Sequence, residues 1–386
     1  MTRTLRIAMN GVTGRMGYRQ HLLRSILPLR EQGGVLLPDG TRVQVEPVLV
    51  GRNETRLREL AAQHDVAEWT TDLDDVIADP ATDVVFDASM TALRAKTLTK
   101  AMQAGKHVYT EKPTAETLAE AVELARLREE VGVTAGVVHD KLYLPGLVKL
   151  RRLVDEGFFG RILSLRGEFG YWVWEGDVQP AQRPSWNYRA QDGGGMTTDM
   201  FCHWNYVLEG IVGTVRTVSS QTATHIPTRW DEQGRPYAAT ADDAAYGVFQ
   251  LETPAGDPVV AQINSSWAVR VHRDELVEFQ VDGTEGSAVA GLFRCVAQPR
   301  SATPKPVWNP DLPTTERFRD QWLEIPDNAD LDNGFKAQWE EFLRDVVAGR
   351  PHRFDLLSAA RGVQLAELGL RSSAEGRRLD VPVITL

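Results

Sequence analysis

Two short motifs contain the residues best suited to proton transfer. The first is the tripeptide EKP at residues 111–113, and the second lies within Gly193–His203 (GGGMTTDMFCH). Asp199 and His203 are four residues apart, so on a helix their side chains share one face. An imidazole titrates near neutral pH, and an ammonium group stabilises negative charge that develops beside it. We therefore expect Lys112, Asp199 and His203 to be the catalytic residues.

A glycine-rich turn near the start of the sequence has the chemistry of a phosphate site. Residues 5–17 read LRIAMNGVTGRMG, which is an apolar strand, a turn and the start of a helix. The spacing is G-x-x-G-x-x-G, with Val12 at the place of the usual first glycine. A pyrophosphate binds at such a helix N-terminus because free N–H groups and the helix dipole favour an anion. We expect a nicotinamide dinucleotide to contact Gly11, Thr13, Gly14, Arg15, Met16 and Gly17.

The end of the second predicted strand bears on the choice of dinucleotide. An acidic residue there accepts the ribose hydroxyls of NAD, whereas basic and small residues accommodate the 2′-phosphate of NADP. The chain has Gly51, Arg52 and Asn53 at this point and no carboxylate, which favours NADP. A cofactor that is recycled in place need not exchange, however, so we expect NAD, with NADP as the alternative. The further cofactor contacts that we expect are Ser89, Glu111 and Lys112.

Strand-like and helix-like segments alternate through the first part of the chain, which predicts a doubly wound parallel sheet. The first strand is followed by a predicted helix over residues 16–30. After residue 140, alternating β-rich segments predict a large, open, mostly antiparallel sheet. The expected fold class is α/β, with a Rossmann domain at residues 1–140 and an α+β domain at 141–386. The closing helix, 356–373, would pack back on the first domain.

Composition narrows the class of protein. The net charge is -10, with acidic residues spread along the chain, which argues against nucleic acid or an anionic membrane as a partner. Two cysteines, Cys202 and Cys295, are too few for a disulfide framework or a thiolate zinc site, and we expect no metal. The start of the sequence has no charged-then-apolar leader, and no apolar run has the length of a membrane span. We expect a cytoplasmic protein.

The glycine turn, EKP, residues 157–167 (GFFGRILSLRG) and the GG-x-x-x-x-D-x-x-x-H motif together closely resemble the Gfo/Idh/MocA family of glucose–fructose oxidoreductase and inositol dehydrogenase. The likeness implies a Rossmann domain followed by an α/β domain whose open sheet forms an interface, hence a homo-oligomer (dimer or tetramer). It also implies that Lys112 contacts the substrate hydroxyl and the nicotinamide, that Asp199 holds a sugar, and that His203 is the general acid and base. Lys112 is the alternative base. Hydride loss from a carbinol carbon fits these roles, because the hydroxyl proton must leave as well.

Two stretches that line the substrate cleft in the family depart from its pattern. Ser89, Met90 and Arg94 stand where the family has Thr-Pro and then His, and residues 138–143 (VHDKLY) are more polar than the usual Asn-Arg run. Tryptophans cluster between residues 172 and 204, and their flat faces suit the C–H faces of sugars. The substrate contacts that we expect are Asp140, Lys141, Tyr143, Trp174, Arg183, Trp186, Arg189 and Asp199.

The sequence leaves two reactions open. The first is net oxidation of a sugar hydroxyl, at C3 of a pyranose, or the reverse reduction. The second is redox-neutral glycoside hydrolysis, in which oxidation at C3 acidifies the C2 hydrogen, the C1 substituent is eliminated, water adds and the hydride returns. The polar cleft edge would suit an anionic glycoside such as a sulfoquinovoside. A dihydrodipicolinate reductase is disfavoured because its His-His…Lys motif is missing, and a non-catalytic dinucleotide sensor need not keep all three proposed catalytic residues.

Overall fold

The computed structural model describes residues 3–173, 175, 183–304, 311, 317–330 and 333–386. The chain forms two compact units, and each draws on separate stretches of the sequence. Unit 1 contains Met1–Tyr143, Asp332–Glu367 and Val383–Leu386, and unit 2 contains Leu144–Leu331 and Leu368–Pro382. Within the described ranges, no helix combines the length and the apolar character that crossing a membrane requires.

Unit 1 is built on a 7-stranded sheet. Its strands are β1 (Thr4–Asn10), β2 (Val35–Leu36), β3 (Arg42–Val50), β4 (Glu68–Thr70), β5 (Val84–Asp87), β6 (His107–Thr110) and β7 (Ala135–Val137). The order is β2-β3-β1-β5-β6-β7, with β4 paired to β3, and only β2 pairs antiparallel. The loops after β1 and β5 leave the same edge side by side, which is where ligands bind in such sheets. The predicted Rossmann sheet is confirmed.

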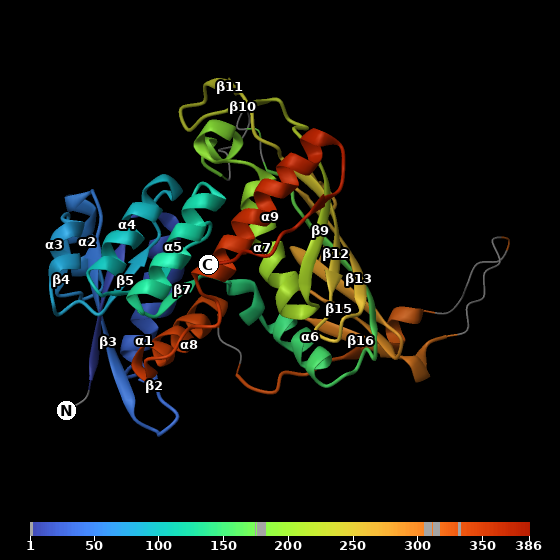
Figure 1. Ribbon diagram of the computed structural model, residues 1–386, viewed down its shortest axis with the longest axis horizontal. Coiled ribbons are helices and arrows are strands. Elements are labelled where there is room, and N and C mark those ends of the chain that lie inside the picture. The colour runs from blue at the N-terminus through green and yellow to red at the C-terminus, as the bar shows by residue number, and fades with distance from the viewer. Residues whose placement is uncertain (1–2, 174, 176–182, 305–310, 312–316, 331–332) are drawn as a thin grey trace. The chain divides into compact units, whose positions relative to one another are not determined.

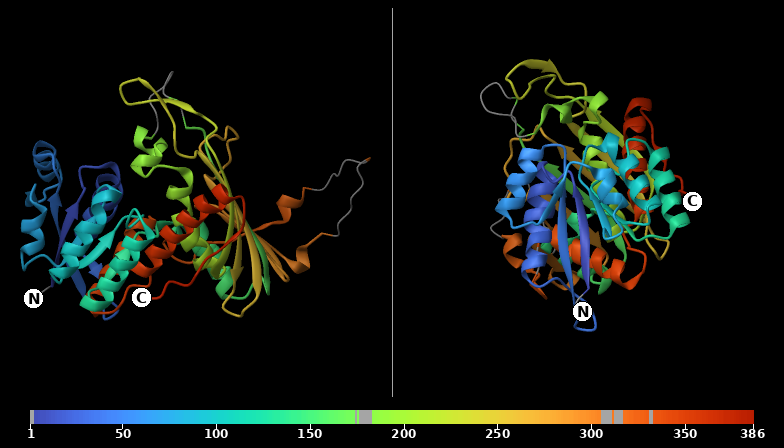
Figure 2. Two further views of the ribbon diagram at one scale, coloured as in Figure 1. Left: turned by 45° about the horizontal axis from the view of Figure 1, so that its top comes forward. Right: turned by 90° about the vertical axis from the view of Figure 1, so that its left-hand side faces the viewer.

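Helices cover both faces of this sheet (Figures 1 and 2). They are η1 (Gly17–Ile26), α1 (Leu27–Glu31), α2 (Glu54–Gln63), α3 (Leu73–Ala78), α4 (Thr91–Gln103), α5 (Leu118–Val131), η2 (Asp140–Tyr143), α8 (Gly334–Ala348) and the first part of α9 (Leu356–Glu375). One core joins the sheet to η1 and α8, and the other joins it to α4, α5 and α9. Because both faces are buried, β5 (VVFD) is buried along its whole length.

The helix expected over residues 16–30 is divided in the structure. A π-helix, η1, runs directly into α1, which has Pro28 in its first turn. Proline has no N–H, so it cannot donate to the carbonyl of Arg24 as an α-helical residue would. The side-chain amide of Asn333 donates to that carbonyl instead, at 2.7 Å. The proline therefore marks the place where the two helical geometries meet.

Unit 2 is built on a 9-stranded sheet in the order β17-β16-β15-β14-β8-β13-β12-β9-β18. These strands are β8 (Ile162–Gly170), β9 (Thr214–Ala223), β12 (Ala244–Glu252), β13 (Pro258–Ser266), β14 (Val277–Gly283), β15 (Gly286–Ala290), β16 (Cys295–Pro299), β17 (Leu323–Glu324) and β18 (Leu379–Asp380). Of the pairs, only β8 with β13 is parallel, so the predicted mostly antiparallel sheet is confirmed. A separate hairpin joins β10 (Thr228–Trp230) to β11 (Pro236–Ala238).

One face of the unit 2 sheet is covered and the other is open. The helices of this unit are α6 (Pro145–Asp155), α7 (Met196–Ile211), η3 (Ser185–Tyr188), η4 (Ala190–Asp192), η5 (Arg300–Ala302), η6 (Phe318–Gln321) and the end of α9. Helices α6 and α7 pack on the same face of the sheet (Figure 1). Along β12, buried and exposed residues alternate, so its other side chains face away from these helices.

Candidate active site

The glycine turn after β1 packs too tightly for larger side chains. Gly11 has a φ of +82°, and a Cβ there would lie 2.7 Å from the carbonyl carbon of Ala88. A Cβ on Gly17 would lie 2.5 Å from the Gly11 carbonyl oxygen. The turn is closed by the N–H of Gly14, which donates to the Gly11 carbonyl at 2.9 Å. This bare backbone at the start of η1 fits the close approach of a dinucleotide pyrophosphate.

The residues after β3 lie next to the same turn. Gly51 faces Thr13, whose methyl carbon would be 3.2 Å from a Cβ on that glycine. Arg52 is exposed, and the side chain of Asn53 caps α2 by accepting from the N–H of Arg56 at 3.0 Å. The residues after β3 therefore provide an exposed cation, Arg52, and a helix cap, Asn53, and the first carboxylate, Glu54, is paired with an arginine one turn along α2.

A buried carboxylate joins the loops at the carboxyl edge of this sheet. Asp87, at the end of β5, accepts from Asn10 at 2.7 Å, from the hydroxyl of Ser89 at 2.9 Å and from Arg94 at 3.3 Å. Asp87 and Arg94 are both almost fully buried. Arg94 also donates to the carbonyl of Ser89 at 2.6 Å and to that of Pro113. The sequence analysis noted Arg94 only because it departs from the Thr-Pro and then His pattern of the family, and it missed Asp87. An aspartate at the end of an apolar strand could have indicated a functional or structural carboxylate.

The EKP loop follows β6 and is held by buried groups. The N–H of Glu111 donates to the Asp87 carbonyl at 2.9 Å, and the Lys112–Pro113 bond is cis. Glu111 is not turned outward as a cofactor contact would be: its carboxylate meets His21 at 2.9 Å and accepts from the N–H of Lys112 at 3.2 Å. Burial opposes ionisation of Glu111, but the His21 hydrogen bond and nearby cations outweigh it and lower its pKa. Lys112 itself is half-buried.

The polar residues after β7 form an acid–base pair and a separate hydrogen-bonded tyrosine. Asp140 and Lys141 lie together on η2, with 3.8 Å between carboxylate and ammonium. The hydroxyl of Tyr143 donates to Glu341 at 2.8 Å and accepts from Arg353 at 3.1 Å. Burial and the Glu341 charge raise the pKa of Tyr143, so it stays a neutral phenol. Its hydroxyl thus binds groups of its own unit, which weakens its expected role as a sugar contact.

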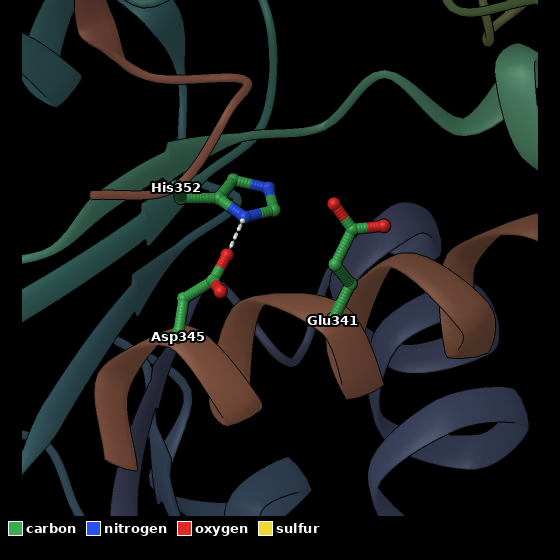
Figure 3. A group of neighbouring side chains, drawn as sticks. All are labelled: Glu341, Asp345 and His352. Atoms are coloured by element: carbon green, nitrogen blue, oxygen red, sulfur yellow. Dashed lines mark hydrogen bonds and ion pairs between the residues drawn. The ribbon is translucent and has the colours of Figure 1, made fainter. Parts of the chain in front are cut away.

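Glu341, Asp345 and His352 form the one group in the described ranges whose atoms approach the spacing of metal ligands (Figure 3). Nδ1 of His352 lies 2.8 Å from Asp345. Each carboxylate also has an arginine partner: Glu341 pairs with Arg353 at 2.7 Å, and Asp345 pairs with Arg350. Two carboxylates with two guanidinium partners are balanced in charge, so this group is better explained as a structural ion-pair cluster than as a cation site.

In unit 2, Asp199 and His203 lie on α7 four residues apart, as predicted. The helix starts after Gly195, whose φ of +129° and proximity to Asp242 exclude a side chain. Asp242 caps this end by accepting from the Thr197 N–H and hydroxyl at 2.8 and 2.7 Å. His203 is 8% exposed, and its Nδ1 lies 2.7 Å from the hydroxyl of Tyr206, a partner that sequence reasoning missed.

Arg183 is bound to Asp199. Its Nη1 donates to the Asp199 carboxylate at 2.9 Å and to the side-chain carbonyl of Asn187 at 3.2 Å. Its Nε donates to the hydroxyl of Tyr171 at 3.1 Å, and the guanidinium lies 4.5 Å from the ring centroid of Trp267. Burial opposes the charge on Arg183, but Asp199 and Tyr171 outweigh it and raise its pKa. Arg183 is therefore a fixed partner of Asp199 and lacks the freedom expected of a receptor for an anionic sugar.

The remaining predicted sugar contacts lie on the loop before α7. Trp186 is 50% exposed and lies on η3. The guanidinium of Arg189 lies 4.5 Å from the Tyr237 ring centroid and 3.8 Å from Asp192. Trp174 lies outside the described residues. An exposed indole can cover the C–H groups of a sugar, and a carboxylate such as that of Asp199 can accept from its hydroxyls.

Comparison with known proteins gives consistent matches over both units. A family model described as an oxidoreductase family with an NAD-binding Rossmann fold matches residues 5–139. A second model, the GFO/IDH/MocA C-terminal domain, matches residues 147–289. A D-xylose dehydrogenase of Paenarthrobacter nicotinovorans is 77% identical over 388 residues, which is 100% of both chains.

More distant relatives have related descriptions. A levoglucosan dehydrogenase of Pseudarthrobacter phenanthrenivorans is 28% identical over 296 residues, or 73% of this chain and 72% of that one. A solved levoglucosan dehydrogenase in complex with NADH and levoglucosan has a TM-score of 0.81, with 21% identity, over 99% of this chain and 100% of that chain. At that identity the structural likeness supports the fold.

Proposed function

The chain belongs to the GFO/IDH/MocA family of oxidoreductases, and from this premise we propose that it oxidises D-xylose. The protein is an NAD-dependent sugar dehydrogenase. The observation that carries the choice of sugar is the 77% identity, over the whole length, to a D-xylose dehydrogenase. NAD, when bound at the glycine turn, supplies the hydride acceptor.

His203 is the proposed base. With its hydrogen on Nδ1, the ring donates to the oxygen of Tyr206, 2.7 Å away, and Nε2 is the nitrogen that can accept the sugar hydroxyl proton. The ammonium group of Lys112 stabilises the alkoxide that forms as the proton leaves. Asp199, oriented by Arg183, accepts from a neighbouring hydroxyl and holds the ring in place.

The carbon that loses hydride depends on the sugar. Sequence analysis favours C3 of a pyranose. For D-xylose we propose C1 in its place, because the ring oxygen stabilises the positive charge that develops on the anomeric carbon as hydride departs. Oxidation at C1 gives a lactone, whereas oxidation at C3 gives a ketone, so the product identifies the carbon.

Purified protein with NAD and a sugar panel tests this function. We expect D-xylose to give NADH and lactone in equal amounts, with a higher kcat/KM than D-glucose or L-arabinose. A xyloside with a chromogenic aglycone tests the redox-neutral hydrolase, which would release aglycone without accumulating NADH. The relatives described above are dehydrogenases and lend that alternative no support. Failure of every aldopentose to reduce NAD would overturn the proposal.

We also propose that the protein is a homo-oligomer joined through the open face of the unit 2 sheet. Tyr246, Val248 and Val260 on this face are 41%, 44% and 49% exposed. Val260 is directly paired with Gln250, two residues beyond Val248, so all three side chains are on one face. Apolar side chains gathered on a flat sheet are typical of a surface that a second copy covers.

A further inference from the structure

A line of buried hydrogen bonds connects three separate parts of unit 1. The indole N–H of Trp339, on α8, donates to Nδ1 of His21 at 2.9 Å. Nε2 of His21, on η1, lies 2.9 Å from a carboxylate oxygen of Glu111. The other oxygen of that carboxylate accepts from the N–H of Lys112 at 3.2 Å. Trp339 and His21 are fully buried, and Glu111 is nearly so.

The donors and acceptors of this line can be assigned from the chemistry of its members. An indole nitrogen only donates, so Nδ1 of His21 must be the acceptor and the ring carries its hydrogen on Nε2. Nε2 then donates to Glu111, whose second oxygen remains to accept from the Lys112 backbone. The bonds from Trp339 and from His21 therefore both point from α8 towards Glu111, and the Lys112 N–H donates to the same carboxylate from within the EKP loop.

The surroundings make these bonds strong and the geometry rigid. The His21 ring centroid lies 4.3 Å from that of Phe86 and 5.2 Å from that of Phe335. Tyr109 and Trp339 complete the aromatic group, with ring centroids 4.3 Å apart. In an apolar, close-packed site a hydrogen bond to a carboxylate is stronger than in water, and the cost of losing it is higher.

We propose that His21 is a positioning residue that fixes the EKP loop, and with it Lys112, relative to the helix that follows the glycine turn. His21 lies on η1, one turn after Gly17. The same helix therefore begins at the glycine turn and is hydrogen-bonded to the EKP loop. Short π-helical segments are frequent at functional sites. This inference rests on the proposed catalytic role of Lys112. We infer in particular that α8, which follows His21 by more than 300 residues in the sequence, determines the tautomer of His21 through the Trp339 hydrogen bond.

The first test removes one hydrogen bond and keeps an aromatic ring at the same position. Trp339→Phe deletes the indole donor, which leaves His21 free to take the other tautomer and release Glu111. We expect kcat for D-xylose oxidation to fall about tenfold, with the KM for NAD changed far less, because a small misplacement of a reacting group lowers the rate more than it lowers binding. Tyr109→Phe is the matched control: it removes a hydroxyl from the same aromatic group, and that hydroxyl has no hydrogen-bond partner among the described residues.

The second test asks whether a side chain that can restore both hydrogen bonds also restores activity. His21→Leu removes both bonds, whereas the amide of His21→Gln can accept from Trp339 and donate to Glu111. We expect the Gln variant to recover most of the kcat that the Leu variant loses. Equal kcat in both, or a Trp339→Phe variant as active as Tyr109→Phe, would overturn the inference. If Lys112→Ala is itself fully active, the proposed catalytic role of Lys112 fails instead, so the two failures are distinguishable.

Discussion

At the scale of single residues, Lys112 and His203 carry the proposed chemistry. Replacing either by Ala removes the ammonium group or the proton acceptor, and we expect kcat to fall about a hundredfold or more in each variant. Steady-state rates with D-xylose and NAD, with folding checked by circular dichroism, measure this. Activity near that of the unmodified protein in both variants would remove the catalytic assignment.

Arg183 is predicted to act on the sugar through Asp199. Arg183→Lys keeps the charge, but a lysine cannot reproduce the forked contacts with Asp199, Asn187 and Tyr171. We expect the KM for D-xylose to rise about tenfold with a smaller change in kcat, since Asp199 binds the sugar ring and does not react. Arg235→Lys, on the exposed β10–β11 hairpin, is the control. An unchanged KM in the Arg183 variant would contradict the role given to Asp199.

At the scale of elements, the Asp87–Arg94 pair decides how β1, β5 and the EKP loop meet. Arg94→Met leaves a buried carboxylate without its cation, and we expect the free energy of unfolding to fall by about 3–5 kcal/mol. Urea denaturation measures the change. On the same helix, Lys100 forms an exposed ion pair with Asp74 at 2.7 Å, so Lys100→Met should cost only about 0–1 kcal/mol. Similar losses in the two variants would show that burial does not matter here.

The histidines near α8 predict how unit 1 responds to acid. Burial lowers the pKa of both His139 and His352, although Asp345 partly offsets the effect on His352. Below the unfolded value of about 6.5, the unfolded chain therefore takes up protons that the folded chain does not, so stability falls as the pH falls and is unaffected above that value. We expect the urea midpoint to drop between about pH 7 and 5.

Substitutions separate this effect from acid sensitivity elsewhere. His352→Gln removes the imidazole of His352 and leaves that of His139, and it should flatten the loss of stability with falling pH. His272→Gln changes an exposed histidine and should leave the slope as it was. A slope that is identical in both variants would rule out buried histidine as the cause.

At the scale of the whole molecule, the open sheet face predicts association. Val248→Glu places a charge in the centre of the apolar residues Tyr246, Val248 and Val260, and a buried unpaired charge is costly enough to break an interface. We expect light scattering after size exclusion to show a smaller species than the unmodified protein. Val271→Glu, at an exposed residue outside the strands, is the control and should not change the mass. An unmodified protein that is already monomeric would contradict the proposal.

Much of the fold and part of the site could be predicted because the signals are local. The glycine turn, the alternation of strands with helices and the four-residue spacing of Asp199 and His203 depend on backbone geometry within a few residues. Helix α7 does place this pair on one element. The expected roles of Arg183 and Glu111 are less well supported, because Arg183 hydrogen-bonds to the half-buried Asp199 and Glu111 to the buried His21.

The sequence by itself thus determined the family and the two sheets, and it predicted the residues proposed for the chemistry, since these depend on period, spacing and side-chain type. Only the tertiary structure decided what holds those residues. Trp339 and His21 are 318 positions apart, and α8 returns to unit 1 after every strand of the second sheet except the last, β18. No local pattern encodes such a contact, because it depends on where the chain runs after burying its apolar faces.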